Sequence, residues 1–146
     1  MKLSTTINGV HFRVRLGMGI TLLGLVIYLL GVDPGLFGLD RSPVLGFVQI
    51  AVLLIGLAIM CLSGYVALNS LWNGSQKSIL ADVGLRLVAT GYLVVVASGL
   101  ADILGFGNHP FPKIPYFGPL QAIGVMIGEV AIVVGFLMII PYPRKR

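Results

Sequence analysis

The sequence predicts an all-α integral membrane protein, a four-transmembrane-helix bundle whose N and C termini are both cytoplasmic. Two observations lead to this fold class. Of the 146 residues, 57% are hydrophobic and only 10% are charged, whereas a typical soluble domain has about 25% charged residues. The mean hydropathy is +1.00, and the apolar residues fall into long stretches. A soluble fold could not bury so much apolar surface, so lipid is the expected solvent.

Four apolar stretches define the expected helices. They cover residues 16–32, 44–68, 83–106 and 120–140. Each has about the 17 to 25 residues that a helix needs to cross roughly 30 Å of hydrocarbon. The stretches lack the alternation of polar and apolar residues that the wall of a β-barrel requires. We therefore expect residues 1–146 to form a single membrane domain with four spans.

Residues that commonly begin or end helices stand at the edges of these stretches. They are Asp33-Pro34-Gly35, Ser42-Pro43, Trp72 with the turn Asn73-Gly74, Ser78, Gly118-Pro119 and Pro141. Proline is tolerated in the first turn of a helix, and serine is a favoured N-cap. Tryptophan prefers the interface between lipid and water.

The distribution of basic residues predicts the orientation. With a cytoplasmic N-terminus, the inner segments hold eight basic residues: Lys2, Arg13, Arg15, Lys77, Arg86, Arg144, Lys145 and Arg146. The outer loops then hold two, Arg41 and Lys113. This follows the positive-inside rule and predicts a multi-pass protein of a cell membrane, namely the cytoplasmic membrane of a prokaryote. We therefore interpret the net charge of +5 as serving contact with anionic lipid, and we expect no binding of nucleic acid.

An internal repeat predicts a duplicated helical hairpin. Residues 46–56 align without a gap onto residues 118–128 and share Gly, Gln, Ile and Gly at an offset of 72. The pattern Asp33-x-x-x-Phe37-Gly38 recurs as Asp102-x-x-x-Phe106-Gly107. We expect hairpin repeat 1 over about 14–72 and repeat 2 over about 78–140, related by a pseudo-twofold axis along the membrane normal. Chance similarity between Gly- and Leu-rich helices is the alternative.

Small residues recur every seven positions along each expected helix. The predicted packing residues are Gly17, Gly24 and Gly31; Gly56 and Ser63; Gly84, Gly91 and Ser98; and Gly128 and Gly135, to which Gly124 is added because it forms a local GxxxG with Gly128,. Small residues mark the contacts between membrane helices, because lipid supplies no hydrophobic drive for association. A seven-residue repeat favours left-handed packing at about 20°.

Glu129 is the one charged residue deep in an expected helix. An ionised side chain there costs roughly 2.5 to 3.5 kcal/mol, so the carboxyl should be protonated, paired or turned to the interior. One hypothesis is a structural hydrogen bond to Thr21, Thr90 or Ser98, or to a partner subunit. The other is a proton or cation site, although no second titratable group is expected at that depth. The repeat places Leu57 at the equivalent position.

Asp33 and Asp102 form an expected acidic pair on the outer face. Asp102 should lie about one turn inside the outer end of the third helix, with Asp33 as its counterpart on the first. The main interpretation is that both lie at the headgroup level and accept hydrogen bonds from backbone amides of the outer loops. An outward-facing cation or substrate contact is the alternative.

The sequence predicts no catalytic, metal or cofactor site. His11 and His109 should lie on opposite sides of the membrane, so they cannot ligate one haem together,. Cys61, the single cysteine, stands in an apolar run and is interpreted as a packing residue,. Common nucleophile, zinc-protease and phosphate-loop motifs do not occur. No cofactor is expected other than bound lipid, and the protein is not expected to be an enzyme.

The expected outer loop over residues 107–119 interleaves four prolines with three aromatic residues. It is interpreted as a cap on the bilayer surface or as a docking surface for another subunit. The partners expected for the chain are the bilayer, other membrane subunits or further copies of itself. The leading functional hypothesis is a non-catalytic subunit of a larger membrane complex, respiratory or photosynthetic. A small oligomeric proton- or cation-coupled transporter or channel using Glu129 is the alternative.

Overall fold

The computed structural model describes residues 2–39, 46–107 and 117–141, with side chains of the first helix described from Gly9 onward. The described elements are α1 (Lys2–Val32), the 3₁₀ helix η1 (Pro34–Phe37), α2 (Phe47–Leu71), α3 (Ile79–Gly99) and α4 (Pro119–Ile139). Each of the four α-helices contains a segment long and apolar enough to cross a membrane. The all-helical class and the four candidate spans are therefore confirmed.

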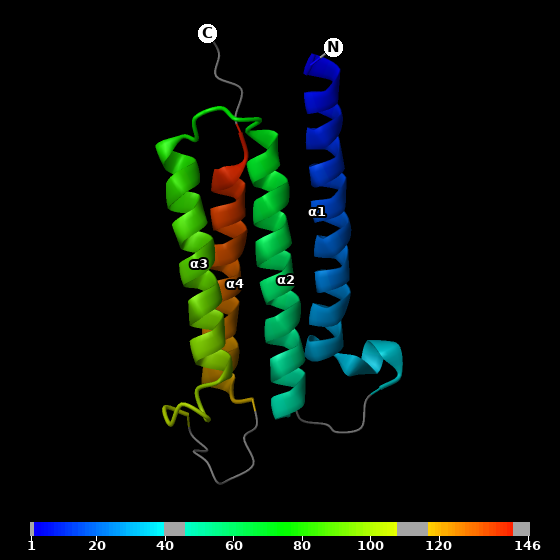
Figure 1. Ribbon diagram of the computed structural model, residues 1–146. Coiled ribbons are helices and arrows are strands. Elements are labelled where there is room, and N and C mark those ends of the chain that lie inside the picture. Colours follow the sequence, from blue (N-terminus) through cyan, green and yellow to red (C-terminus); the bar gives the residue numbers. More distant parts are fainter. Residues whose placement is uncertain (1, 40–45, 108–116, 142–146) are drawn as a thin grey trace.

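The four helices run up and down as a bundle, and the start of α1 and the end of α4 lie at the same end of it (Figure 1). We call this the terminal end and the other the loop end. Backbone contacts pair α1 with α2 and α3 with α4, and α2 also contacts both helices of the second pair. The bundle thus consists of two hairpins that meet along α2, with α1 on the outside.

Several helix boundaries differ from the sequence-based expectation, and the first helix begins at Lys2, well before the expected stretch 16–32. The second helix begins at Phe47, and the expected start at Ser42-Pro43 lies outside the described residues. The third helix ends at Gly99, so its expected extension to Phe106 is wrong. The N–H groups of Phe106 and Gly107 both donate to the carbonyl of Ala101, closing a turn instead of a helix. Apolar composition continues through this turn, but composition alone does not set backbone conformation.

The first residues of α2, α3 and α4 are capped, and the cap of α3 is the one that the sequence predicts. The Oγ atom of Ser78 accepts a hydrogen bond of 3.1 Å from the N–H of Ala81, which caps α3. At α2 and α4 a glutamine in the first turn accepts from the N–H of the glycine three residues earlier. These bonds measure 2.8 Å from Gly46 to Gln49 and 2.7 Å from Gly118 to Gln121. The Gly and Gln shared by the two sequence segments therefore have the same structural role.

Glycines lie where the paired helices approach most closely. In the first hairpin Gly24 faces the carbonyl of Gly56, and in the second Gly91 faces the carbonyl of Gly128. A Cβ atom added to Gly128 would lie 2.6 Å from the carbonyl oxygen of Gly91. Because real Cβ atoms do not approach so closely, these positions accept glycine and little else.

The contacts of the two hairpins follow the same register. Gly17 faces Ser63 and Ala67 on α2, and Gly84 faces Gly135 and Ile139 on α4. Gly84 follows Gly17 by 67 residues. On the second helix of each hairpin, Gly135 follows Ser63 and Ile139 follows Ala67 by 72 residues, which is the offset of the sequence alignment. Gly31 and Ser98 extend this register, since Gly31 packs on Leu53 and Ser98 packs on Gly124.

Apolar side chains fill the space between the hairpins. Val95 of α3 is fully buried at 0% exposure, and Leu57 and Leu54 of α2 are also buried. Gly99 of α3 lies against Ile50 and Leu54, which brings the loop ends of α2 and α3 together. The outward faces of all four helices carry exposed Leu, Ile, Val and Met side chains, and this composition suits contact with lipid.

We expect Gly128→Ala to lower the free energy of unfolding by about 1–3 kcal/mol, the usual effect of overpacking. The added methyl would overlap the Gly91 carbonyl and the Val95 side chain. Unfolding of the purified protein by increasing sodium dodecyl sulfate in mixed micelles, followed by circular dichroism, measures the effect.

The matched control is Gly19→Ala on α1, where an added Cβ has open space around it. Alanine there should be neutral or stabilising by up to about 1 kcal/mol, because alanine favours helix more than glycine does. Equal effects of the two substitutions would contradict close packing at Gly128.

Candidate functional site

A hydrogen bond between α1 and α4 holds the carboxyl group of Glu129. The phenol of Tyr28 donates to Oε1 of Glu129 at 2.5 Å, and both side chains are partly buried. In the described part of the chain, no backbone contacts join these two helices. The Tyr28–Glu129 pair therefore forms a side-chain link between the outer helix of one hairpin and the other hairpin.

The packing of the hairpins places the two groups at one level. The backbone nitrogen and Cα of Tyr28 lie against Gly56, where a side chain on α2 would overlap them. Gly56 corresponds to Gly128 at the offset of 72, and Glu129 directly follows Gly128. The close approach of α1 to α2 thus sets the height from which the phenol reaches α4.

The geometry of the link is that of a strong hydrogen bond. A separation of 2.5 Å lies at the short end of the range for hydroxyl groups that donate to carboxylates. A carboxyl group among apolar helices needs such a donor, because lipid offers none. The phenol of Tyr28 thus supplies a hydrogen-bond donor to one carboxyl oxygen of Glu129, and the bond fixes the position of α1 relative to α4.

The three hydroxyl residues expected to pair with Glu129 lie elsewhere. Thr21 donates to the carbonyl of Gly17 at 2.8 Å, and its Oγ1 lies 2.8 Å from Oγ of Ser63. Thr90 is exposed on α3, and Ser98 packs against Gly124. Tyr28, and none of these three, donates to Glu129 among the hydrogen bonds of the described residues. Thr21 bonds within its own helix, as short hydroxyl side chains commonly do,, whereas a phenol reaches farther.

Sequence reasoning missed Tyr28 as a site residue. It lies only four positions before Val32, the last residue of α1, where a tyrosine is ordinarily placed at the interface between lipid and water. The spacing of the glycines could have identified it. Tyr28 packs on Gly56 in the first hairpin as the buried Val95 packs on Gly128 in the second. A phenol at a core-facing position requires a hydrogen-bond partner.

The two acidic residues of the loop end have different environments. Asp33 is exposed and caps η1 by accepting a 3.0 Å hydrogen bond from the N–H of Gly35. Asp102 is buried, with 4% exposure, in the turn after α3 and beside Gly107. Its expected place inside the third helix is wrong, because that helix ends at Gly99. Asp33 thus accepts from a backbone amide as expected, and the two residues differ in burial although each follows the first helix of its hairpin.

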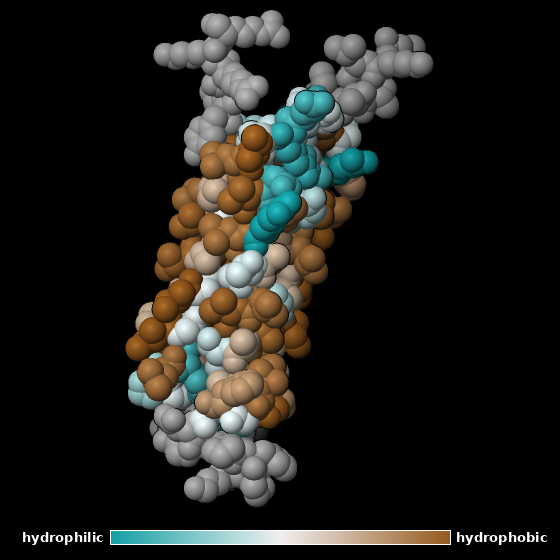
Figure 2. Space-filling view, turned by 90° about the vertical axis from the view of Figure 1, so that its left-hand side faces the viewer, coloured by the Kyte–Doolittle hydropathy of each residue, from teal (hydrophilic) through white to brown (hydrophobic). Residues whose placement is uncertain are grey.

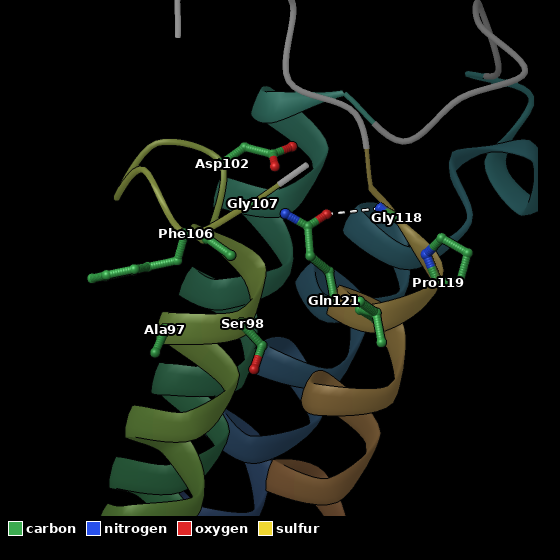
Figure 3. A pocket seen from close by; sticks show the side chains of 10 residues that line it. Ala97, Ser98, Asp102, Phe106, Gly107, Gly118, Pro119 and Gln121 are labelled. Carbon is green, nitrogen blue, oxygen red and sulfur yellow. Dashed lines mark hydrogen bonds between the residues drawn. The ribbon is translucent and has the colours of Figure 1, made fainter. Parts of the chain in front are cut away.

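Asp102 lines a cavity of about 300 Å³ at the loop end, between the turn after α3 and the start of α4. Figure 3 shows Asp102 and Gln121 approaching this space from the two elements, with Ser98 deeper along α3. The carbonyl oxygen of the Gln121 side chain is occupied by the N–H of Gly118. The cavity therefore presents a carboxyl group together with the amide group of a helix cap.

Two further aromatic donors join the hairpins in the described part of the chain. The phenol of Tyr92 on α3 donates to the carbonyl of Leu54 on α2 at 3.3 Å. The indole Nε1 of Trp72 donates to the carbonyl of Ile139 at 2.9 Å, joining α2 and α4 at the terminal end. Together with Tyr28, these side chains place polar links at three positions between the hairpins.

The remaining candidate groups are separated from one another. Cys61 is buried in α2, and His11 is exposed on α1. Among the residues that the structure describes, no three His, Cys, Asp or Glu side chains are grouped to hold a metal ion. His109 and most of the proline-rich loop over residues 107–119 lie outside the described residues.

Comparison with protein-family models, curated proteins and solved structures finds no match to this chain. Functional inference therefore rests on the chain's own residues.

A double-mutant cycle with Tyr28→Phe and Glu129→Leu should give a coupling energy of about 0.6–1.7 kcal/mol, between the mean and the maximum measured for hydrogen bonds between membrane helices. Glu129→Leu alone leaves the phenol without its acceptor, and the double variant removes both polar groups. The free energy of unfolding in mixed micelles gives the coupling.

Tyr92→Phe combined with Glu129→Leu is the control pair. Tyr92 bonds the carbonyl of Leu54, so its effect should add to that of Glu129→Leu within about 0.5 kcal/mol. A coupling of zero between Tyr28 and Glu129 would show that the link does not hold in the folded protein.

Proposed function

We propose that this protein is a non-catalytic integral membrane subunit that packs into a larger membrane complex and stabilises it. The observation that carries the proposal is the use of Glu129, the intramembrane carboxyl group, as the acceptor in a link between helices. A carboxyl group that holds α1 against α4 through a hydrogen bond has a structural role, as expected in a subunit that stabilises a complex. A membrane complex of the respiratory or photosynthetic type would suit such a subunit.

The shape of the bundle supports this proposal. Helix α1 contacts α2 along one side, while much of its remaining surface exposes apolar side chains such as Phe12, Leu22 and Leu23. Helices that pack on one neighbour keep a wide face for other membrane helices. The protein therefore offers surface to partners and commits little of its length to soluble segments.

The alternative proposal is a small oligomeric transporter or channel for protons or cations that uses Glu129. It is favoured by the position of Glu129 between the two hairpins, since secondary transporters place their sites where repeats meet. In that case Tyr28 would have to release the carboxyl group during each cycle.

We also infer that the two hairpins arose by duplication. The inference is supported by the matching glycine register and by the repeated Gly–Gln caps of α2 and α4. The copies differ at the positions that link them: Tyr28 stands where the second hairpin has Val95, and Glu129 stands where the first has Leu57. The asymmetric pair would then be a change acquired after duplication.

The proposed topology places the terminal end in the cytoplasm of a prokaryotic cell. It is supported by the excess of lysine and arginine in the segments at that end, because cytoplasmic loops of membrane proteins are enriched in both.

Extraction in a mild detergent should recover the protein together with stable membrane partners, and Glu129→Gln should leave the activity of that assembly nearly unchanged. The amide keeps an acceptor for the phenol of Tyr28, so the link survives. Native purification followed by mass spectrometry identifies the partners, and an assay of the recovered complex measures its activity.

The same variant separates the two proposals. Vesicles containing only the purified protein should show no proton flux above that of protein-free vesicles. Flux that depends on the protein and is abolished by Glu129→Gln would contradict the subunit proposal and establish transport.

Thiol labelling of intact cells should support the proposed topology. In a Cys61→Ala background, Leu39→Cys at the loop end should react with a membrane-impermeant maleimide added outside, and Ser75→Cys at the terminal end should react only after permeabilisation. Both positions are exposed. The reverse pattern would place the termini outside the cell.

A further inference from the structure

A narrow apolar groove runs between α2 and α3 on the terminal half of the bundle. Its volume is about 330 Å³, and it extends from Ala58 and Tyr92 to Tyr65 and Leu85. Small side chains, including Ala89, leave this space open. The eight residues that it spans on each helix correspond to roughly 10 Å along the helix axis,.

The lining of the groove is apolar along its whole length of roughly 10 Å,. Such a lining suits a hydrocarbon chain of a lipid. The charged side chains at the end of the groove distinguish a lipid from an apolar helix of another subunit.

Basic side chains stand where the groove meets the terminal end. Tyr65 closes the groove there, and the Nζ atom of Lys77 lies 5.3 Å from the centre of its ring and donates to its hydroxyl at 3.4 Å. Lys77 and Arg13 line the same polar cleft of about 650 Å³, together with Asn69 and Trp72. Tyr65, which lines the groove, is thus in contact with Lys77, which lines the cleft.

The surface of the molecule shows the same division. In Figure 2, hydrophilic residues gather near the end where the termini lie, and hydrophobic residues cover most of the wall below them. Arg86 also lies in this half of α3, but its guanidinium is paired with Asp82 at 3.1 Å. The cleft side chains Lys77 and Arg13 are both exposed.

We propose that the groove and the cleft together bind one anionic phospholipid. An acyl chain occupies the α2–α3 groove, and the phosphate lies against Lys77 and Arg13. Basic pockets between membrane helices recognise anionic headgroups, with about 1 kcal/mol for each lysine or arginine near the surface. Trp72 in the cleft is typical of headgroup depth, and a lysine at this level extends its amine toward the headgroups. This proposal does not depend on the proposed subunit function.

The test is native mass spectrometry of the purified protein in the presence of phosphatidylglycerol and phosphatidylethanolamine with identical acyl chains. Wild-type protein should retain phosphatidylglycerol in preference to phosphatidylethanolamine. Lys77→Gln and Arg13→Gln should each weaken phosphatidylglycerol binding about fivefold, the equivalent of one surface charge, and should leave phosphatidylethanolamine binding unchanged. Ala89→Leu should reduce the binding of both lipids by filling the groove.

The matched control is Arg86→Gln, which removes the same charge from the same end of the bundle outside the cleft. It should leave phosphatidylglycerol binding within twofold of wild type. An equal loss in Arg86→Gln and Lys77→Gln would show a diffuse attraction and overturn the proposal. Equal binding of the two lipids by wild-type protein would do the same.

Two other outcomes would assign the surface to a different occupant. Displacement of phosphatidylglycerol by millimolar inorganic phosphate, with no effect of Ala89→Leu, would indicate a site for a soluble anion. A dimer that Ala89→Leu dissociates would indicate a second copy of the chain in the groove. Either result overturns the phospholipid proposal.

Discussion

Contact between helix backbones at glycine is the constraint on which the rest of this structure depends. Lipid supplies no hydrophobic drive between helices, so association requires close packing and polar contacts. The absence of side chains at Gly56 and Gly128 lets α1 and α3 approach their partners. The same approach sets the height of Tyr28 against Glu129. A seam of small residues therefore positions the link between the Tyr28 phenol and the Glu129 carboxyl group.

Local signals in the sequence were sufficient for most of the fold. Hydropathy predicts the four helices, Ser78 and Gly118 mark helix starts, and the spacing of small residues identifies positions of close approach. The end of α3 could not be predicted in the same way. The residues after Gly99 remain apolar, and only their hydrogen bonds, with Gly105 at φ +81, show that the backbone turns there.

The candidate site was predictable only in part. Charge alone identifies Glu129, because a carboxyl group in a long apolar stretch is conspicuous. Its partner depends on which helices are neighbours and on their relative depth, and neither follows from one helix considered alone. Tyr28 lies near the end of α1, yet its backbone rests on Gly56, well inside α2. Asp102 shows the same limitation, since its burial depends on where α3 ends.

The pairing of helices has a consequence for how the chain is made. Each seam joins two helices that are consecutive along the chain, α1 with α2 and α3 with α4. The first pair can therefore associate in the bilayer while the ribosome is still translating the second, because domains generally fold as units during synthesis. The second pair then docks through Val95 and the aromatic donors. Assembly needs only one late encounter between two preformed halves.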